Sequence, residues 1–322
     1  MSSGTVADGS SPLPPPVSGV PADVEALTTA IIDPPNRFIR YPLARGLFRI
    51  AGGLPFTPNQ ITYTHAALGV CAAGIVAFAS ETWFPLVFVL CEVRAVLDCY
   101  DGEVARGKKL FSPWGRTIDE LSDAVSFLAM NFAFAYRIHT PMAYLMTFLV
   151  IQQGAISAWS YDFFKRKFTL ALREAKDSIA LELTPKLERK RQGSMTFLPA
   201  FSLFFDMLQV NFLSRHSRAE TLLAARDGAT NPALYNTTDV RRVRAAAKSK
   251  KFRFTLSLLS LMTGDNTFLL LSLGLVFKNL YGFQLITAGY GYVLLALGFL
   301  FAQSVLRTPT AAERGRANSA AS

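Results

Sequence analysis

The chain has 322 residues, of which 51% are hydrophobic and 17% are charged, and its formal net charge at pH 7 is +10. Long apolar runs separated by short polar turns are typical of a polytopic membrane protein and exclude an ordinary soluble core. The basic residues lie in loops without a recognised nucleic-acid-binding fold around them, so the positive charge does not indicate a nucleic-acid partner.

The N-terminal residues 1–35 are predicted to form a disordered tail. Residues 1–22 are rich in Ser, Pro and Gly, contain neither Lys nor Arg, and lack the apolar core of a signal peptide. Residues 36–55 then mix arginines with large apolar side chains at helical spacing, which favours an amphipathic helix lying on an anionic lipid surface. The alternative for this second segment is an irregular, solvated arm.

Six apolar segments are long enough to cross a bilayer as helices. Residues 127–135 and 269–277 are apolar on nearly every side, whereas the helices of a soluble protein would be amphipathic. Spans one to four belong to residues 56–162, and spans five and six to residues 253–307. We therefore predict an all-α polytopic membrane protein with six transmembrane helices, at about 60–79, 82–105, 117–137, 141–162, 253–277 and 284–306.

Two kinds of residue inside the spans are assigned structural roles. Cys71, Cys91 and Cys99 form no C-x2-C pair, so they are predicted to be reduced, with no disulfide and no zinc. His65 is interpreted as a buried, hydrogen-bonded histidine and not as a metal ligand.

Four aspartates interrupt the apolar sequence around the turn between spans two and three. Asp98 and Asp101 are three residues apart, Asp119 and Asp123 are four apart, and Asp119 follows Asp101 by 18 residues. Each pair therefore shares one face of its helix. Ionised carboxylates are costly in an apolar helix, and a divalent metal would give all four a common reason to be there. Oxygen ligands from two helices suit Mg²⁺ or Mn²⁺, and their number suits two ions better than one.

Small residues accompany the first pair of aspartates. Gly102 and Ala105 lie on the same helix face, where they are expected to leave a shallow trough for a ligand to approach the backbone. The alternative, unrelated carboxylates at helix ends near the water interface, does not account for so many fixed offsets.

A long basic segment, residues 163–252, separates spans four and five and is predicted to be a helical cytoplasmic insertion. Its first amphipathic helix is expected to stop at Thr184-Pro185. Residues 197–213 are apolar but carry several polar side chains and have positive charge on both sides, which favours an interfacial or re-entrant helix over a seventh span. Residues 237–239 are expected to cap a basic helix that leads into span five. Residues 308–322 are predicted to be a second disordered tail.

The distribution of basic residues predicts the topology. Of the 33 Lys and Arg, 19 lie between Lys165 and Arg253, and 11 more precede span one, join spans two and three, or follow span six. The opposite loops hold only Arg137 and Lys278. The positive-inside rule therefore places both termini, the aspartates and the insertion on the cytoplasmic side of a cell or inner membrane.

The sequence around the aspartates resembles the signature of the CDP-alcohol phosphotransferase family, D-x2-D-G-x2-A-R-x8-G-x3-D-x3-D. Every fixed position is filled, by Asp98, Asp101, Gly102, Ala105, Arg106, Gly115, Asp119 and Asp123. The resemblance extends from about Asn59 to Tyr161 and is only architectural beyond, because family members usually have a shorter segment in place of the insertion. It implies that an alcohol hydroxyl attacks the β-phosphorus of a CDP-linked donor, so that CMP leaves and a phosphodiester forms.

The same resemblance implies roles for single residues. Asp98, Asp101, Asp119 and Asp123 are expected to bind two Mg²⁺ or Mn²⁺ ions, and Asp123 is also the candidate catalytic base. Family members often have a P-N-x-x-T element at the start of span one that helps to hold the cytidine. The expected nucleotide-binding residues are Asn59, Thr62, Asp98, Gly102, Ala105, Arg106 and Gly115. A homodimer is expected from the resemblance alone.

Five further residues are candidates for substrate contacts. Arg94 precedes the first aspartate by one helical turn and is expected to brace it or to contact a phosphate, with a snorkelling side chain as the alternative. Lys165 and Arg166 end span four and are expected to hold a lipid phosphate. Asp265 and Asn266 interrupt span five and are expected to contact the acceptor; the alternative is polar packing beside a glycine kink.

These observations predict an enzyme of phospholipid biosynthesis that transfers a substituted phosphate from CDP-diacylglycerol to an alcohol. The alternative reaction uses a soluble CDP-alcohol and a lipid or soluble hydroxyl acceptor. A cation transporter or channel would spread acidic residues along several spans, whereas here they cluster at one end of two helices. An inactive scaffold would tend to lack a motif aspartate, and none is missing.

Overall fold

The computed structural model describes residues 22–110, 115–226, 234, 237–309 and 313, and every regular element among them is a helix. The chain divides into two compact units, each described below by itself. The first unit holds Ile32–Ala158 and Leu261–Leu295. The second holds the described parts of Ser18–Ile31, Trp159–Ser260 and Ala296–Ser322. Two long helices, α6 (Pro141–Glu174) and α13 (Leu280–Arg307), contribute residues to both units.

The first unit begins with the predicted amphipathic segment, which forms a short π-helix, η1 (Asn36–Arg40), followed by α2 (Tyr41–Ala51). The segment turns apolar side chains outward, because Ile39, Leu43 and Ile50 are exposed. Arg40 and Ala44 face inward and are buried. Outward apolar side chains beside exposed arginines suit a helix that lies on a lipid surface.

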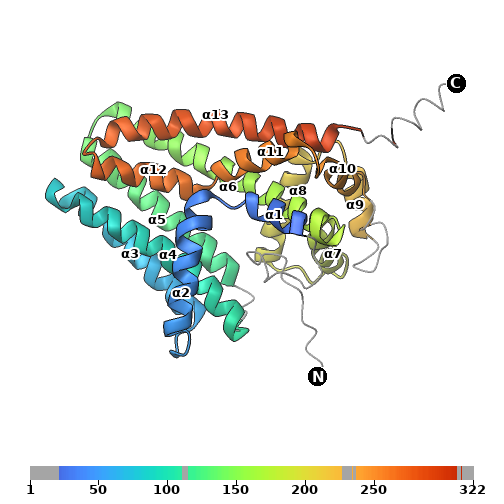
Figure 1. Cartoon of the computed structure of the whole chain (residues 1–322), viewed down its shortest axis with the longest axis horizontal. Coiled ribbons are helices and arrows are strands. Elements are labelled where there is room, and N and C mark those ends of the chain that lie inside the picture. The colour runs from blue at the N-terminus through green and yellow to red at the C-terminus, as the bar shows by residue number, and fades with distance from the viewer. Residues whose placement is uncertain (1–21, 111–114, 227–233, 235–236, 310–312, 314–322) are drawn as a thin grey trace. The chain divides into compact units, whose positions relative to one another are not determined.

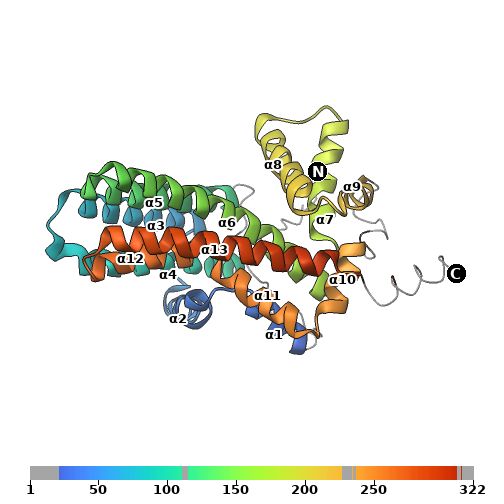
Figure 2. The same ribbon diagram turned by 90° about the horizontal axis from the view of Figure 1, so that it is seen from above.

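Three helices carry the aspartates and their surroundings, and they lie side by side in Figures 1 and 2. α3 (Pro58–Phe78) packs against both α4 (Phe84–Lys108) and α5 (Gly115–Ile138), and a 3₁₀ turn, η2 (Glu81–Trp83), joins α3 to α4. A reciprocal capping box starts α3, in which the Gln60 amide donates to Thr57 Oγ1 at 3.3 Å and the Thr57 amide donates to Gln60 Oε1 at 2.9 Å.

Close packing of α3 on α5 depends on a glycine. A Cβ atom at Gly69 would lie only 2.4 Å from Ser126 Oγ, so no larger residue fits without separating the two helices. Beyond this contact, buried apolar side chains of α3, α4, α5 and α12 form one core; they include Val76, Val87, Phe134 and Leu271.

The described helices confirm a helical membrane protein but not the number of spans. Among them α3, α6 and α13 are long and apolar enough to cross a bilayer by themselves. α11 (Lys250–Leu261) and α12 (Gly264–Val276) are bent by 50° and could together form a fourth, broken span. α4 and α5 are longer than α3, but the aspartates and arginines of the motif lower their hydropathy.

The helix predicted over 253–277 is not continuous, because α11 ends at Leu261 and α12 begins at Gly264. Thr263 has an extended backbone (φ −68°, ψ 152°), and its hydroxyl accepts a hydrogen bond from the Asn266 amide at 3.3 Å. Thr263 is therefore an N-cap, and Asp265 lies in the first turn of a new helix. The polar residues start a helix here; they do not kink one.

The second unit corrects two further predictions. α1 (Ala22–Ala30) is helical and buries Leu27, with Ile31 just beyond it, so the tail predicted over 1–35 does not include residues 22–35; residues 1–21 lie outside the described residues. α6 continues to Glu174, and α7 (Ser178–Arg191) includes Pro185. The first helix of the insertion ends earlier than predicted, because Asp177 starts a new helix, α7, by accepting hydrogen bonds from the amides of residues 179 and 180.

Three helices complete the insertion: α8 (Phe197–Leu213), α9 (Arg218–Arg226) and α10 (Thr238–Ala246). α7 packs against α8 and α9, as Figure 2 shows. The polar side chains of α8 point toward the unit, since Asp206 pairs with Lys186 and Gln209 donates to the Trp159 carbonyl at 3.2 Å. Its phenylalanines point outward, and the exposed ones are Phe197, Phe201, Phe204, Phe205 and Phe212. An outward apolar stripe agrees with the predicted interfacial helix.

Candidate active site

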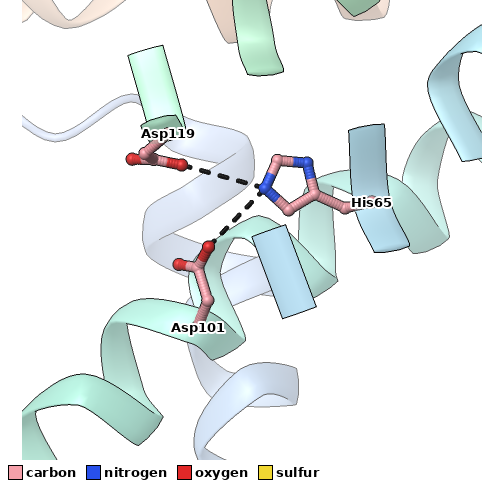
Figure 3. A group of neighbouring side chains, drawn as sticks. All are labelled: His65, Asp101 and Asp119. Atoms are coloured by element: carbon pink, nitrogen blue, oxygen red, sulfur yellow. Dashed lines mark ion pairs between the residues drawn. The ribbon is translucent and has the colours of Figure 1, made fainter. Parts of the chain in front are cut away.

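The carboxylates of the motif converge on one histidine of α3. Asp98 and Asp101 come from α4, Asp119 and Asp123 from α5, and His65 lies between them. Figure 3 shows the His65 ring with one nitrogen directed at both Asp101 and Asp119. The four aspartates predicted from their spacing therefore do meet, and a histidine that was assigned a structural role joins them.

The distances around His65 are longer than hydrogen bonds. Its Nε2 atom lies 3.7 Å from Asp98 Oδ1, 3.6 Å from Asp101 Oδ2 and 3.8 Å from Asp119 Oδ1. The side chain is 0% exposed, and neither ring nitrogen has a hydrogen-bond partner. Asp119 Oδ1 is also buried without one. Buried polar atoms normally find partners, so these atoms indicate a group that binds between them.

Donor atoms from two overlapping sets are close enough to share a cation. The sets are His65 with Asp101 and Asp119, and His65 with Asp98 and Asp123, and within each set the donor atoms lie within 4.8 Å of one another. Carboxylate oxygens and one imidazole nitrogen fit a divalent ion. The residues present therefore fit the predicted metal site.

Thr62 forms a hydrogen bond with one of the motif aspartates, a role that the sequence analysis did not predict. Its hydroxyl donates to Asp101 Oδ2 at 2.5 Å and lies 3.1 Å from the Pro58 carbonyl oxygen. Thr62 therefore orients a motif carboxylate, whereas the sequence assigned it to the nucleotide. Asn59 lies half-buried in the first turn of the same helix.

Arg94 pairs with Asp123, whereas the sequence suggested Asp98 as its partner. Its Nη2 atom donates to Asp123 Oδ1 of α5, and its guanidinium lies 5.2 Å from the centre of the Phe268 ring. Arg94 is buried, while the Asp123 side chain is 49% exposed. A buried arginine thus fixes the one motif carboxylate that is also most accessible to a substrate.

The trough expected beside Gly102 is lined by Arg106. A Cβ atom at residue 102 would lie 3.2 Å from Arg106 Nη1, and Arg106 Nη2 pairs with Glu103 Oε1 at 2.9 Å. Arg106 Nη1 is buried without a hydrogen-bond partner and can donate to an anion. Ala105 is half-buried beside it, and Gly115 is the first residue of α5.

Asp265 anchors the N-terminal helix to the start of α12. Its Oδ2 accepts from Asn36 Nδ2 at 2.7 Å, and its Oδ1 lies 3.4 Å from Arg40 Nη1. Arg40 is 1% exposed and also binds Glu92 through two hydrogen bonds, at 2.9 and 3.1 Å. Asn266 is buried, and its amide donates to the Thr263 cap. No sequence pattern linked these residues, because 229 positions separate Asn36 from Asp265.

Lys165 and Arg166 belong to the second unit, so their contact with a substrate at the aspartates stays a prediction. Arg166 pairs with Asp162 at 2.7 Å and with Glu182, and it donates to Gln209 Oε1 at 3.1 Å. Lys165 Nζ lies 5.3 Å from the centre of the Tyr161 ring. Arg166 is therefore already neutralised by carboxylates of its own unit.

The helical membrane fold and the aspartate–histidine site together define an integral membrane protein with a candidate metal-dependent active site. Residues 56–186 match the model of the CDP-alcohol phosphatidyltransferase family, which confirms the resemblance seen in the motif for this part of the chain. No solved structure matches the chain.

One curated relative is the bifunctional IPC transferase and DIPP synthase of Thermococcus kodakarensis. It is 31% identical over 115 residues, which are 35% of this chain and 25% of the relative. The chain thus covers about a quarter of the length of this relative, and the likeness concerns one part of it only.

His65, Asn36 and Arg40 are the residues of the site region that the sequence analysis did not assign to it. His65 follows Thr62 by three positions, so the two share a helix face, and that spacing was the available signal. Arg40 was counted only among the basic residues that precede span one, and its burial against Glu92 and Asp265 separates it from the others.

Proposed function

We propose that this chain is a metal-dependent phosphotransferase that moves a substituted phosphate from a CDP-linked donor to an alcohol and releases CMP. We propose CDP-diacylglycerol as the donor. The observation that carries the proposal is the convergence of all four motif aspartates around His65 on a helical membrane scaffold. The matched family and the names of the curated relative, a transferase and a synthase, support the same reaction class.

Each motif residue has a task in this proposal. Asp98, Asp101 and Asp119 hold the divalent ions, and Thr62 keeps the Asp101 carboxylate in place through its hydrogen bond. Bound ions supply the charge that neutralises the pyrophosphate oxygens and stabilises the leaving CMP. Arg106 donates to the phosphates or the cytidine, and the remaining nucleotide contacts come from Asn59, Gly102, Ala105 and Gly115.

Asp123 accepts the proton of the attacking hydroxyl. Its side chain is the most exposed of the four carboxylates, and Arg94 holds one of its oxygens, which leaves the other available to the acceptor. A general base must lie within hydrogen-bond reach of the proton that it removes, so a fixed carboxylate at an accessible position suits this task.

Asp265 is proposed to contact the acceptor, and Asp265→Ala is expected to raise the acceptor KM or to lower kcat while donor affinity stays unchanged. The change also removes a partner of Arg40, so Glu92→Gln serves as a matched control that disturbs the same arginine. Steady-state kinetics with varied acceptor measure both variants. If Glu92→Gln reproduces the kinetic change, Asp265 acts through Arg40 and does not touch the acceptor.

We propose further that α4 and α5 cross the membrane with α3, α6, α13 and the broken pair α11–α12, which gives six spans. Both termini, the aspartates and the insertion then face the cytoplasm, because 30 of the 33 Lys and Arg lie on that side. With this topology the exposed phenylalanines of α8 rest in the cytoplasmic leaflet.

A homodimer is proposed from the family alone.

Two single cysteines test this topology after Cys71, Cys91 and Cys99 have been replaced by Ala. We expect Ser194→Cys, in the turn between α7 and α8, to react with a membrane-impermeant maleimide only when the cytoplasmic face is open. Tyr281→Cys, at the start of α13, is expected to react from the opposite face. Labelling of residue 194 from the outer face would contradict the topology and would make α8 a seventh span.

The reaction itself is tested by measuring CMP release from the purified full chain in detergent with Mg²⁺ or Mn²⁺, across a panel of donors and acceptors. We expect CDP-diacylglycerol with a small water-soluble alcohol phosphate or serine to give the highest rate. A higher rate with a soluble CDP-alcohol would replace the proposed donor by the alternative one. No CMP release with any pair would contradict the proposed reaction class and reopen the cation-transport alternative.

A further inference from the structure

We propose that His65 is a direct nitrogen ligand of the metal centre, and that this imidazole makes the site favour Mn²⁺ over Mg²⁺. The inference rests on the metal site of the proposed function but not on the identity of the donor or the acceptor. It adds a ligand that lies outside the eight fixed motif positions, on a different helix from all four aspartates.

The spacing of the donor atoms favours a shared ion over direct contacts. A hydrogen bond or close ion pair would bring a ring nitrogen to about 2.7–3.2 Å from a carboxylate oxygen. His65 Nε2 instead lies 3.6 to 3.8 Å from oxygens of Asp98, Asp101 and Asp119. Two donors that are each about 2.1 Å from one ion are separated by at most about 4.2 Å, so these distances suit ligands of a single cation.

Burial supports the same conclusion. The His65 side chain is fully buried, and both of its nitrogens lack a hydrogen-bond partner. A buried polar group without a partner costs free energy, on the order of 1–3 kcal/mol. An ion bound between Nε2 and the carboxylates would satisfy the nitrogen and the buried oxygen of Asp119 at the same time.

The position of the imidazole is fixed by the packing of α3. One turn beyond His65, Gly69 brings the backbone of α3 against Ser126 of α5. One turn before it, Thr62 binds Asp101 of α4. His65 is therefore held between the two helices that supply the carboxylates, as a ligand of a preformed site should be.

A nitrogen ligand changes which ion the site prefers. Mg²⁺ favours oxygen donors and keeps its waters, whereas affinities for N and O donors rise along the first transition series, where imidazole is a common ligand. A site of carboxylates alone would suit Mg²⁺ well. Adding His65 shifts the preference toward Mn²⁺ and the later ions of the series.

Pulsed EPR of the Mn²⁺-loaded full chain in detergent tests the bond directly. The chain contains three histidines, His65, His139 and His216, so the double variant His139→Gln/His216→Gln retains only His65. We expect a directly bound ¹⁴N coupling in the wild type and in this double variant. When the double variant is grown with ¹⁵N-labelled histidine, the coupling should change to that of ¹⁵N, without any substitution at the site. Absence of a directly bound nitrogen in the wild type, or an unchanged ¹⁴N signal after labelling, would overturn the proposal.

Calorimetric titration with Mn²⁺ and with Mg²⁺ tests the preference. His65→Gln is expected to raise the Kd for Mn²⁺ by about 10- to 100-fold and the Kd for Mg²⁺ by clearly less. An equal loss for both ions would contradict the preference. These results separate the two proposals. A nitrogen-bound ion without CMP release would contradict only the proposed reaction. CMP release without a bound nitrogen would contradict only the proposed role of His65.

Discussion

Asp98→Asn, Asp101→Asn, Asp119→Asn and Asp123→Asn are each expected to abolish transfer, and EDTA is expected to do the same to the wild type. Each substitution removes a charged donor from the sets that surround His65. Metal-ion stabilisation of the developing charge is worth several kcal/mol, so each loss should lower kcat by about a thousandfold or more. CMP release with saturating divalent ion measures the effect.

A neighbouring carboxylate provides the control for these variants. Glu120 lies next to Asp119 on α5 and is exposed, so Glu120→Gln should leave the rate within about twofold. Asp123→Asn should still bind the donor if Asp123 acts mainly as a base, and equilibrium binding in the presence of metal checks this. Substantial turnover in EDTA, or in any two of the four aspartate variants, would contradict a metal-dependent reaction at this site.

Lys167→Met is expected to destabilise the second unit by about 3–5 kcal/mol, because it leaves buried carboxylates without their cation. Lys167 Nζ lies 2.5 Å from Asp239 Oδ2 and 3.7 Å from Asp177 Oδ2, and it donates to Ser214 Oγ at 2.9 Å. Its side chain is 2% exposed, and both carboxylates are fully buried. This cluster joins α6 to α7 and α10 and to the turn after α8.

Thermal unfolding in detergent measures the loss. Lys176→Met is the matched control, since it breaks a more exposed ion pair with Glu174 and should cost at most about 1 kcal/mol. The double variant Lys167→Met/Asp239→Asn should lose less than the sum of the two single changes, because it removes both charges of one pair. Equal melting temperatures for Lys167→Met and the control would show that the cluster does not stabilise the unit.

The same cluster gives a pH dependence. Burial alone would raise the pKa of Asp239, but the charge of Lys167 and hydrogen bonds from His216, Lys167 and Ser217 hold that pKa well below its ordinary value. A carboxylate with a lowered pKa in the folded protein stabilises it above its unfolded pKa, and the stabilisation is lost as the pH falls toward the folded value. The difference in melting temperature between wild type and Lys167→Met should therefore be largest at neutral pH and shrink as the pH falls. Protonation relieves the unpaired carboxylates of the variant, and the wild type loses its stabilisation below about pH 4.

The spacing of the aspartates was enough to predict the centre of the site, because residues three or four positions apart share a helix face whatever the rest of the fold does. The partner of Arg94 was not predictable in this way. Asp98 is one turn away on the same helix, but Asp123 on α5 is the carboxylate that the guanidinium reaches. The choice depends on how closely two helices pack, and a sequence pattern does not contain that distance.

Some helix starts had a capping residue in the sequence, but the prediction gave more weight to the surrounding apolar residues or to a proline. Thr263-Gly264-Asp265 is a sound N-cap sequence, yet the long apolar stretches on both sides favoured one unbroken span. Asp177 likewise has the chemistry of a cap, whereas Pro185 was weighted as the stop. In both places the side chain that accepts a backbone hydrogen bond decided where the helix begins. The anchoring of Asp265 by Asn36 and Arg40 had no local signal at all.

The most direct test of the proposed function is the stoichiometry of transfer. Purified wild-type chain with Mn²⁺ or Mg²⁺, radiolabelled CDP-diacylglycerol and its best alcohol acceptor should release one CMP for every phosphodiester formed, with no release when the acceptor is omitted. CMP release that does not depend on an alcohol, or a phosphodiester that forms without CMP, would contradict a transfer from a CDP-linked donor to an alcohol.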